Sequence, residues 1–433
     1  MSAASMASAS MASASMPIAK VKSATSTAAA PASLKLKSAL KPVAAAPAAA
    51  LPHIEFHDSP SSALLFTLEN VNLSHANAIR RVILSDIPTV VFDDIKMIKN
   101  TTRLNNELIQ QRLRCIPIHV GETEMKEFLA SNYRVEINES FETDRIKYVT
   151  TEHFALDTTT DPVARANPNF TINRLFPPFP FQDKEYYIDI ARLRPPITAD
   201  APGDVLYFTA GFKKATAKED KCYNVASTCS YGFTIDLKKQ EEAWEKEKAK
   251  WTTGLSAVEM EFKKRDWEFL DGKRFFKTDD QNEPNSFAFI IETVGPFTNK
   301  SILQQAIAVI RAELAQFLNL VKGVHIPIVT ANATMEKCYD VQLNVKQEGE
   351  KPMFVAGYTI GKVIEAELHK KFVSGGQTDR KLTFCAFRKP HPHIDDCYIR
   401  VAGQHRDEVK KMLEEAAEEA DKVFKILLDI VVK

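Results

Sequence analysis

Two long stretches of this chain carry the apolar spacing of helices that pack along a shared seam. In both stretches apolar residues recur at alternating steps of three and four, which places them on one stripe of a helix. The first stretch, Ser301–Val321, carries Leu303, Ala306, Ile310, Leu314, Phe317 and Val321. The second runs from about His405 onward and carries Val409, Leu413, Ala416, Ala420, Val423, Leu427 and Ile430. Because burying apolar side chains away from water is favourable, we expect the two helices to pack with these stripes facing each other.

The segments in front of the two long helices repeat one order of elements. In the first half, alternation and helical spacing predict strands at Ile54–Glu69, Val90–Ile98 and Ser286–Val294, and helices at 74–87 and Asn105–Arg114. In the second half they predict strands at Tyr339–Val345, Leu382–Phe387 and Cys397–Val401, and a helix at Ile360–Lys371. We therefore predict an α+β fold of two dimerisation modules, each a sheet with a long helix, packed as a pseudo-dimer within one chain. Its seam is predicted to contain Ile79, Ile83, Leu303, Ile310, Leu314, Phe317, Val321, Val409, Leu413, Ala420, Val423 and Leu427.

The pattern changes between the two halves. Tyr186–Leu193 and Val205–Phe212 alternate as strands, and Lys238–Lys250 is typical of a charged, solvated helix with Trp244 and Trp251 on one face. We predict an inserted, mainly β domain. The predicted domains are a tail (1–53), a first module (54–120 plus 286–330), the insertion (121–285) and a second module (331–433).

Charge balance and cysteine content limit the class of protein. Lysine and arginine number 56, and so do aspartate and glutamate, so the formal net charge is zero at pH 7. A protein that binds DNA tightly by itself usually carries a basic stripe, and none dominates here. Six scattered cysteines favour a reducing compartment, and no apolar run approaches the roughly 20 residues of a membrane span. We expect a soluble, intracellular protein that does not interact with membranes.

Residues 1–53 form an Ala/Ser-rich tail with five lysines and no acidic residue. Such a segment cannot bury enough apolar surface to offset the entropy of ordering it, so we expect it to be disordered. We interpret it as a spacer. A basic tail that contacts nucleic acid and a transit peptide are the alternatives.

The stretch Asn70–Ile118 is the most specific part of the sequence. Ser74 is the expected N-cap of its first helix, and Pro88 ends that helix. Opposite the apolar face lie the adjacent Arg80 and Arg81, which suit bidentate contacts at an interface but are also typical of ordinary solvated charges. The stretch resembles the signature segment of the alpha-like assembly subunits of multisubunit DNA-directed RNA polymerases. It is similar to the third-largest-subunit type, which is related to bacterial alpha and archaeal D.

The second half is similar to the small partner subunit of the same polymerases, the eleventh-subunit or archaeal L type. The residues that match this pattern are Thr359, Gly361, Pro390, His391, Pro392, Arg400 and Val401. Gly357 and Tyr358 stand where the family usually has an acidic pair. The chain thus looks like a natural fusion of two alpha-like subunits, an arrangement expected of the RNA polymerases of nucleocytoplasmic large DNA viruses.

The resemblance implies a non-catalytic assembly and scaffold subunit of a DNA-dependent RNA polymerase. Its implied partners are the second-largest and largest subunits and a small assembly subunit, with DNA contacted only through the complex and no homo-oligomer. Residues that match the family's docking face are Asn77, Arg80, Arg81, Asn100, Thr101, Glu107 and Arg112. The complex is expected in the host cytoplasm or nucleus, or packaged in the virion. The alternative is an autonomous DNA-binding transcription factor that dimerises through its seam helices.

Catalytic and metal sites lack their usual parts in this sequence. Asp93–Asp94 and Asp279–Asp280 have no supporting motif for two-metal nucleotidyl transfer, and no phosphate loop or nucleophile elbow is present. The run Pro390–Asp396 offers two histidines and two aspartates, but its prolines favour a structural turn over a zinc site. Cys222 and Cys229 have no second pair near them. We predict no catalytic residue, no cofactor and no metal.

Overall fold

The computed structural model of the chain describes most of the residues after the tail. They are 50–59, 62–128, 130–141, 145–157, 170–196, 202–251, 256–323, 326–345, 354–355, 357–374, 381–391, 393–394 and 396–433. The predicted tail lies outside the described residues up to residue 49. The mixed helices and sheets confirm the α+β class.

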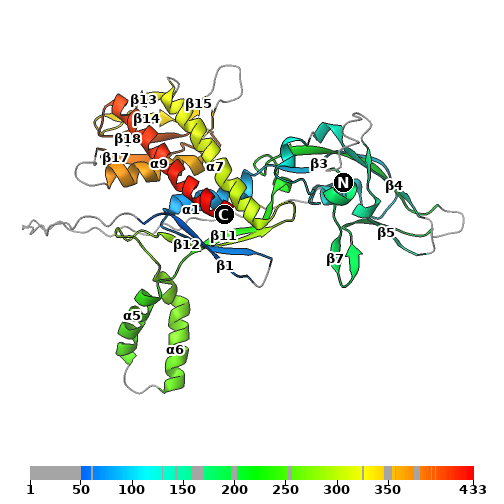
Figure 1. Cartoon of the computed structure of the whole chain (residues 1–433), viewed down its shortest axis with the longest axis horizontal. Helices are drawn as coiled ribbons and strands as arrows, with labels where there is room; N and C mark the ends of the chain where they lie inside the picture. Colours follow the sequence, from blue (N-terminus) through cyan, green and yellow to red (C-terminus); the bar gives the residue numbers. More distant parts are fainter. Residues whose placement is uncertain are drawn as a thin grey trace, which may run out of the picture. The chain divides into compact units, whose positions relative to one another are not determined.

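A four-stranded antiparallel sheet and two helices form the first module (Figure 1). In chain order its elements are β1 (His53–His57), β2 (Leu64–Glu69), α1 (Leu73–Ser85), β11 (Ala226–Phe233), β12 (Ser286–Thr293) and α7 (Asn299–Lys322). The strands lie in the order β1-β2-β12-β11. The single strand predicted at Ile54–Glu69 is therefore wrong, since this stretch forms the antiparallel pair β1 and β2.

The second module repeats this topology element by element. In chain order it contains β13 (Ile328–Thr330), β14 (Cys338–Gln342), α8 (Tyr358–Leu368), β17 (Phe384–Arg388), β18 (Tyr398–Ala402) and α9 (Arg406–Val432). Its strands lie in the order β13-β14-β18-β17, which corresponds one to one with the first sheet. A π-helical turn (His369–Val373) follows α8, and the short strands β15 (Asn344–Val345) and β16 (Phe354–Val355) pair with each other.

Two separate segments interrupt the first module. The longer one, between α1 and β11, builds the sheet β3-β10-β4-β6 and two small strand pairs, β5-β9 and β7-β8. Its elements are β3 (Thr89–Asn100), α2 (Asn106–Arg114), β4 (Arg134–Ser140), β5 (Lys147–Thr150), β6 (Ala155–Asp157), α4 (Ile172–Leu175), β7 (Phe179–Phe181), β8 (Lys184–Tyr186), β9 (Asp189–Leu193) and β10 (Val205–Ala215). The shorter one, between β11 and β12, holds the helices α5 (Leu237–Lys248) and α6 (Ala257–Leu270).

The predicted insertion of residues 121–285 needs correction at both of its boundaries. Strand β11 lies inside that range but pairs with β12 in the sheet of the first module. Strand β3 lies outside the range but pairs with β10 of the inserted sheet. The polar edge strand β11 shows little of the alternation that reveals a half-buried strand. Residue spacing alone therefore did not separate it from the insertion.

The N-cap of helix α1 lies two residues before the predicted cap. Asn72 is the N-cap, with an extended backbone, and its side-chain Oδ1 accepts a hydrogen bond from the Ser74 backbone N–H at 2.8 Å. Ser74 itself lies in the first turn. The prediction of Ser74 as the cap is wrong because an asparagine two residues before it performs the same capping chemistry.

Helices α7 and α9 pack against each other in antiparallel directions. Their cross-contacts are Gln304 Nε2 to the Val431 carbonyl (3.3 Å), Arg311 to both Asp421 oxygens (2.8 and 3.2 Å) and Lys322 Nζ to Glu418 Oε1 (2.9 Å). All predicted seam residues are buried except Val423, which is half-exposed. Phe424 is buried in its place, because four residues from Ala420 match the helical repeat better than three at this point.

Within the described part of the chain, no helix combines the length and the apolar character that crossing a bilayer requires.

Candidate functional site

Helix α1 carries its polar candidates on the face opposite its buried residues. Ile79, Val82 and Ile83 are buried, whereas Asn77 and Arg80 are half-exposed and Arg81 is exposed. Arg80 donates from Nε and Nη2 to Asn77 Oδ1, at 3.1 and 3.0 Å. This pairing of neighbouring turns holds the Arg80 guanidinium along the helix. Asn77, Arg80 and Arg81 are called the α1 patch below.

Arg81 connects the two modules as well as facing solvent. Its Nε donates to Thr359 Oγ1 in the first turn of α8, at 3.2 Å. A guanidinium has five N–H donors in a rigid fork, so this one bond leaves donors for another partner. Arg81 can therefore both join α1 to α8 and contact an incoming chain.

Asn100 and Thr101 hold the turn that follows β3. Asn100 Nδ2 donates to the Leu104 carbonyl at 2.8 Å and to Asn106 Oδ1 at 2.9 Å. Thr101 exchanges backbone and hydroxyl hydrogen bonds with Val205 at the start of β10. The polar groups of Asn100 and Thr101 thus stabilise the local structure. Only the solvent-exposed parts of these two residues could contact a partner.

Helix α2 presents Glu107 and Arg112 on its exposed side. Arg112 Nη2 donates to the Asp189 carbonyl on β9 at 2.6 Å. Glu107 lies in the first turn of α2, where a carboxylate interacts well with the helix dipole, and it has no hydrogen-bond partner among the described residues. Asn100, Thr101, Glu107 and Arg112 are called the α2 patch.

The structure does not bring these residues together in one place. Helix α1 ends before the first residue of β3, and Asn100 is the last of the twelve residues of this strand. At the rise of an extended strand this corresponds to about 35 Å. The α1 patch and the α2 patch are therefore two surfaces on opposite ends of β3, and one small ligand could not contact both.

A buried histidine–glutamate pair is a feature that sequence reasoning missed. His75 of α1 and Glu367 of α8 are both buried, with His75 Nε2 3.4 Å from Glu367 Oε1 but not aligned for a hydrogen bond. Burial lowers the pKa of His75 to about 4 and raises the pKa of Glu367. The imidazole is therefore neutral at pH 7. The available signal was His75 itself, a titratable side chain on the apolar side of α1.

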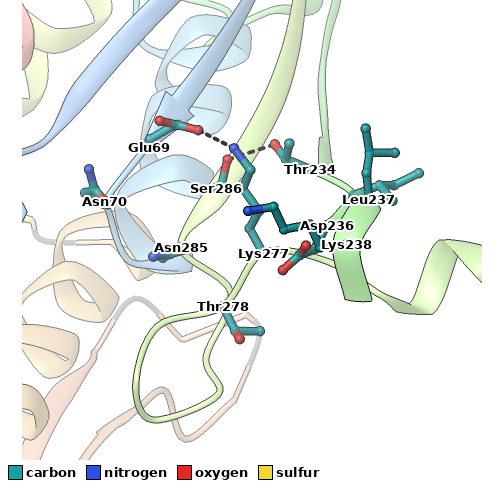
Figure 2. Close-up of a pocket in the computed structure, with 11 residues that line it drawn as sticks. Glu69, Asn70, Thr234, Asp236, Leu237, Lys238, Lys277, Thr278, Asn285 and Ser286 are labelled. Carbon is teal, nitrogen blue, oxygen red and sulfur yellow. Dashed lines mark hydrogen bonds and ion pairs between the residues drawn. The ribbon is translucent and has the colours of Figure 1, made fainter. Parts of the chain in front are cut away.

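A pocket of about 700 Å³, lined mostly by polar residue types, lies where the chain passes from β11 of the first sheet to α5 (Figure 2). Lys277 Nζ donates to Glu69 Oε1 at 2.8 Å, and the Ser286 hydroxyl donates to Thr234 Oγ1 at 2.9 Å. The Lys277 hydrogen bond lowers the pKa of Glu69. These side chains form hydrogen bonds with one another. We therefore interpret the pocket as a structural junction between the sheet and the helices rather than as a catalytic site.

No metal-binding group emerges from the described residues. They contain no cluster of three or more histidine, cysteine, aspartate or glutamate side chains suited to a metal ion. His391 Nδ1 accepts a hydrogen bond from the backbone N–H of His393 at 3.1 Å, which is a contact within a turn. Pro392 and Asp395 of the same run lie outside the described residues. Burial raises the pKa of the Cys222 thiol to about 11 and of Cys229 to about 12, which opposes the thiolate form that metals bind.

The first sheet with α1 and α7 forms an α+β module whose long helix packs against the long helix of a second module with the same strand order. Residues 65–314 match the RNA polymerase Rpb3/Rpb11 dimerisation domain, and the chain belongs to this family. The resemblance to alpha-like polymerase subunits is thereby confirmed at the level of the family.

Several polymerase subunits are similar to this chain over different lengths. DNA-directed RNA polymerase subunit Rpo3 of Pyrococcus horikoshii is 24% identical over 271 residues, which cover 59% of this chain and 92% of the relative. DNA-directed RNA polymerases IV and V subunit 3B of Arabidopsis thaliana is 26% identical over 196 residues, covering 44% and 60%. DNA-directed RNA polymerase II subunit RPB3 of Schizosaccharomyces pombe is 36% identical over 66 residues, covering 15% and 22%.

Proposed function

We propose that this chain is a non-catalytic assembly and scaffold subunit of a DNA-dependent RNA polymerase. The observation that carries the proposal is the family match over the first module, the module whose α1 presents Arg80 and Arg81 to solvent. Relatives that are polymerase subunits support it. In this proposal the second-largest subunit docks first and the largest follows, with a small assembly subunit also bound.

We further propose that residues 331–433 act as the eleventh-subunit or L-type half of the scaffold. The support is the topology: the second module has the same strand order as the first, and its long helix packs on α7. A partner that is normally a separate chain would then be covalently attached. Linkage replaces an encounter between two proteins by an intramolecular one. A second copy of the chain is not needed to cover either long helix.

The α1 patch and the α2 patch divide the docking task in this proposal. They lie at opposite ends of β3, so they suit two contact regions on large partners rather than one binding pocket. DNA would be contacted only through the assembled enzyme. The resemblance to polymerases of nucleocytoplasmic large DNA viruses makes the host cytoplasm or nucleus, or the virion, the place where the complex would act.

The test is assembly with the two large subunits in a co-expression system. Changing both Arg80→Glu and Arg81→Glu should leave the chain folded but block recruitment of the second-largest subunit, because the fork donors are replaced by carboxylates. Thr359→Val is the matched control, since it removes the internal bond of Arg81 and keeps both arginines. An unchanged yield of complex with the double variant, or an equal loss with Thr359→Val, would contradict docking through the α1 patch.

The alternative, a DNA-binding transcription factor, predicts a different result from the purified chain. Such a factor binds naked DNA alone, and its affinity falls steeply with salt because each phosphate contact releases counterions. A scaffold binds naked DNA poorly at all salt concentrations and co-purifies with two very large subunits. A salt titration of DNA binding distinguishes the two.

A further inference from the structure

The pair of helices between β11 and β12 is not used by the proposed scaffold. Helices α5 and α6 lie side by side beyond the first sheet (Figure 1), and an aromatic cluster holds them together. Trp267 of α6 packs 5.4 Å from Trp244 of α5 between ring centroids, and Trp244 lies 6.2 Å from Trp251. Lys263 Nζ sits 4.3 Å above the Trp251 ring. One face of α6 is thereby fixed against α5.

The opposite face of α6 is apolar and exposed. Val258, Phe262 and Phe269 are 63%, 62% and 69% exposed. Together with Arg265 they follow steps of four, three and four, which is the a and d spacing of a coiled-coil helix. Lys273 Nζ lies 4.9 Å above one face of the Phe269 ring, and among the described residues no other aromatic ring stacks on Phe262 or Phe269. Isolated exposed apolar residues are ordinary, but an aligned stripe marks a contact surface.

The positions that flank this stripe are all acidic. In the same heptad, the e positions are Glu259 and Asp266, and the g positions are Glu261 and Glu268. Glu259 accepts hydrogen bonds from the Ser256 backbone and hydroxyl, which lower its pKa and keep it charged. Glu268 has only an exposed contact with Lys264 at 3.8 Å. The flanking charges therefore face solvent as a negative rim. Arg265 inside the stripe and Lys273, whose ammonium lies against the Phe269 ring at its end, are positive charges next to this rim.

We propose that this face of α6 docks an amphipathic, basic helix of another protein. Charges at the e and g positions select the partner of a helix pair, so four acidic positions call for lysine or arginine on the partner. Arg265 at a d position calls for an acidic side chain at the layer facing it. The same rim disfavours a second copy of this chain, which would bring like charges together, and it disfavours the phosphates of nucleic acid. This inference goes beyond the proposed scaffold function and does not rest on it.

The length of α6 sets the strength of the contact. Its fourteen residues span about 20 Å, which is two heptads. Isolated helix pairs of this size are weak, so the interaction is a reversible one in which α5 contributes by holding α6 straight. A partner of this kind could be gained or lost without disturbing the sheets.

The experiment uses the full chain and a synthetic amphipathic helix as the probe. The probe carries leucine at its core positions, glutamate opposite Arg265 and lysine at its flanking positions, and a matched probe carries glutamate at those flanks. Binding is measured by fluorescence anisotropy of the labelled probes. We expect the lysine probe to bind at least about tenfold more tightly than the glutamate probe, as complementary charges select partners.

Three variants decide the assignment. Phe262→Ser should abolish binding, because its side chain is the central apolar contact. The double change Glu261→Lys with Asp266→Lys should cancel the preference between the two probes, because two acidic and two basic flanking positions then remain. Glu241→Lys with Glu242→Lys, on the exposed side of α5, is the matched control and should keep the original preference. All altered residues are exposed, so each variant should fold, and circular dichroism checks this.

Four results would overturn the proposal. The first is equal binding of both probes by the unaltered chain, and the second is unchanged binding by Phe262→Ser. The third is a change of probe preference in the α5 control equal to that in the α6 double variant. The fourth is self-association of the unaltered chain that Phe262→Ser removes. The last result would assign the face to a second copy of the chain.

Discussion

The packing of α9 can be tested by truncating two neighbouring residues. Phe424 is fully buried and its ring lies 5.2 Å from that of His75, whereas the adjacent Val423 is half-exposed. Phe424→Ala removes a whole aromatic ring from the core and leaves a cavity, so it should cost about 3–5 kcal/mol of unfolding free energy. Val423→Ala removes two partly solvated methyl groups and gains helix propensity. Its net cost should stay below about 1 kcal/mol.

The assay is urea unfolding followed by far-ultraviolet circular dichroism, which reports on all helices together. Tryptophan fluorescence is the wrong probe for this purpose, because all three tryptophans lie in the α5–α6 region. Hydrogen exchange of the α9 amides gives a local measure if the two modules unfold in separate steps. If Val423→Ala lowers the unfolding free energy as much as Phe424→Ala or more, Phe424 is not the buried residue of this turn. The stripe predicted from spacing, in which Val423 faces the core, would then be correct.

Two further predictions concern the second module and its contact with α1. Because the pKa of His75 falls from 6.5 to about 4 on folding, the unfolded chain binds the extra proton between these values, and stability is lost as the pH falls. From pH 7 to pH 5 the loss is about 2 kcal/mol, and His75→Phe should remove it in urea titrations at both pH values. The raised pKa of Glu367 acts in the opposite sense but is common to both proteins, so identical pH slopes would contradict the assignment. Gly361→Ala should destabilise the chain by about 1–3 kcal/mol in the same assay, because the added Cβ would collide with the Phe387 ring. Gly357→Ala, where nothing lies within 4 Å of the new Cβ, should stay near the unaltered protein, and equal effects of the two changes would argue against that close contact.

The long elements of the fold were predictable because their spacing is sustained. The helices α7 and α9 were expected within two residues of their observed starts, and α1 and α8 were found at the places where helical spacing predicted them. Edge strand β11 and helix α6 were not predicted. In β11 the polar residues obscure the alternation of a half-buried strand. In α6 the apolar stripe faces solvent instead of the core. In neither element does the pattern of apolar residues match the pattern of buried residues.

The candidate site was predictable in part. Helical geometry placed Arg80 and Arg81 opposite the apolar face of α1, and Asn77 was added by the resemblance to the polymerase family. The separation of Asn100 from them depends on β3 continuing as one long strand, which residue spacing did not indicate to its full length. The internal hydrogen bonds of Arg81 and Arg112 join residues 278 and 77 positions apart, and no local pattern reveals such contacts.

The antiparallel packing of α7 on α9 also has a consequence for synthesis. Roughly 110 residues separate the end of α7 from the end of α9, and a ribosome adds about 5–20 residues per second. For roughly 5 to 20 seconds the nascent chain therefore displays the part of α7 that later packs against α9, although α1 and β12 can already pack against other parts of this helix. We expect chaperone binding to concentrate in that interval and to end once α9 emerges.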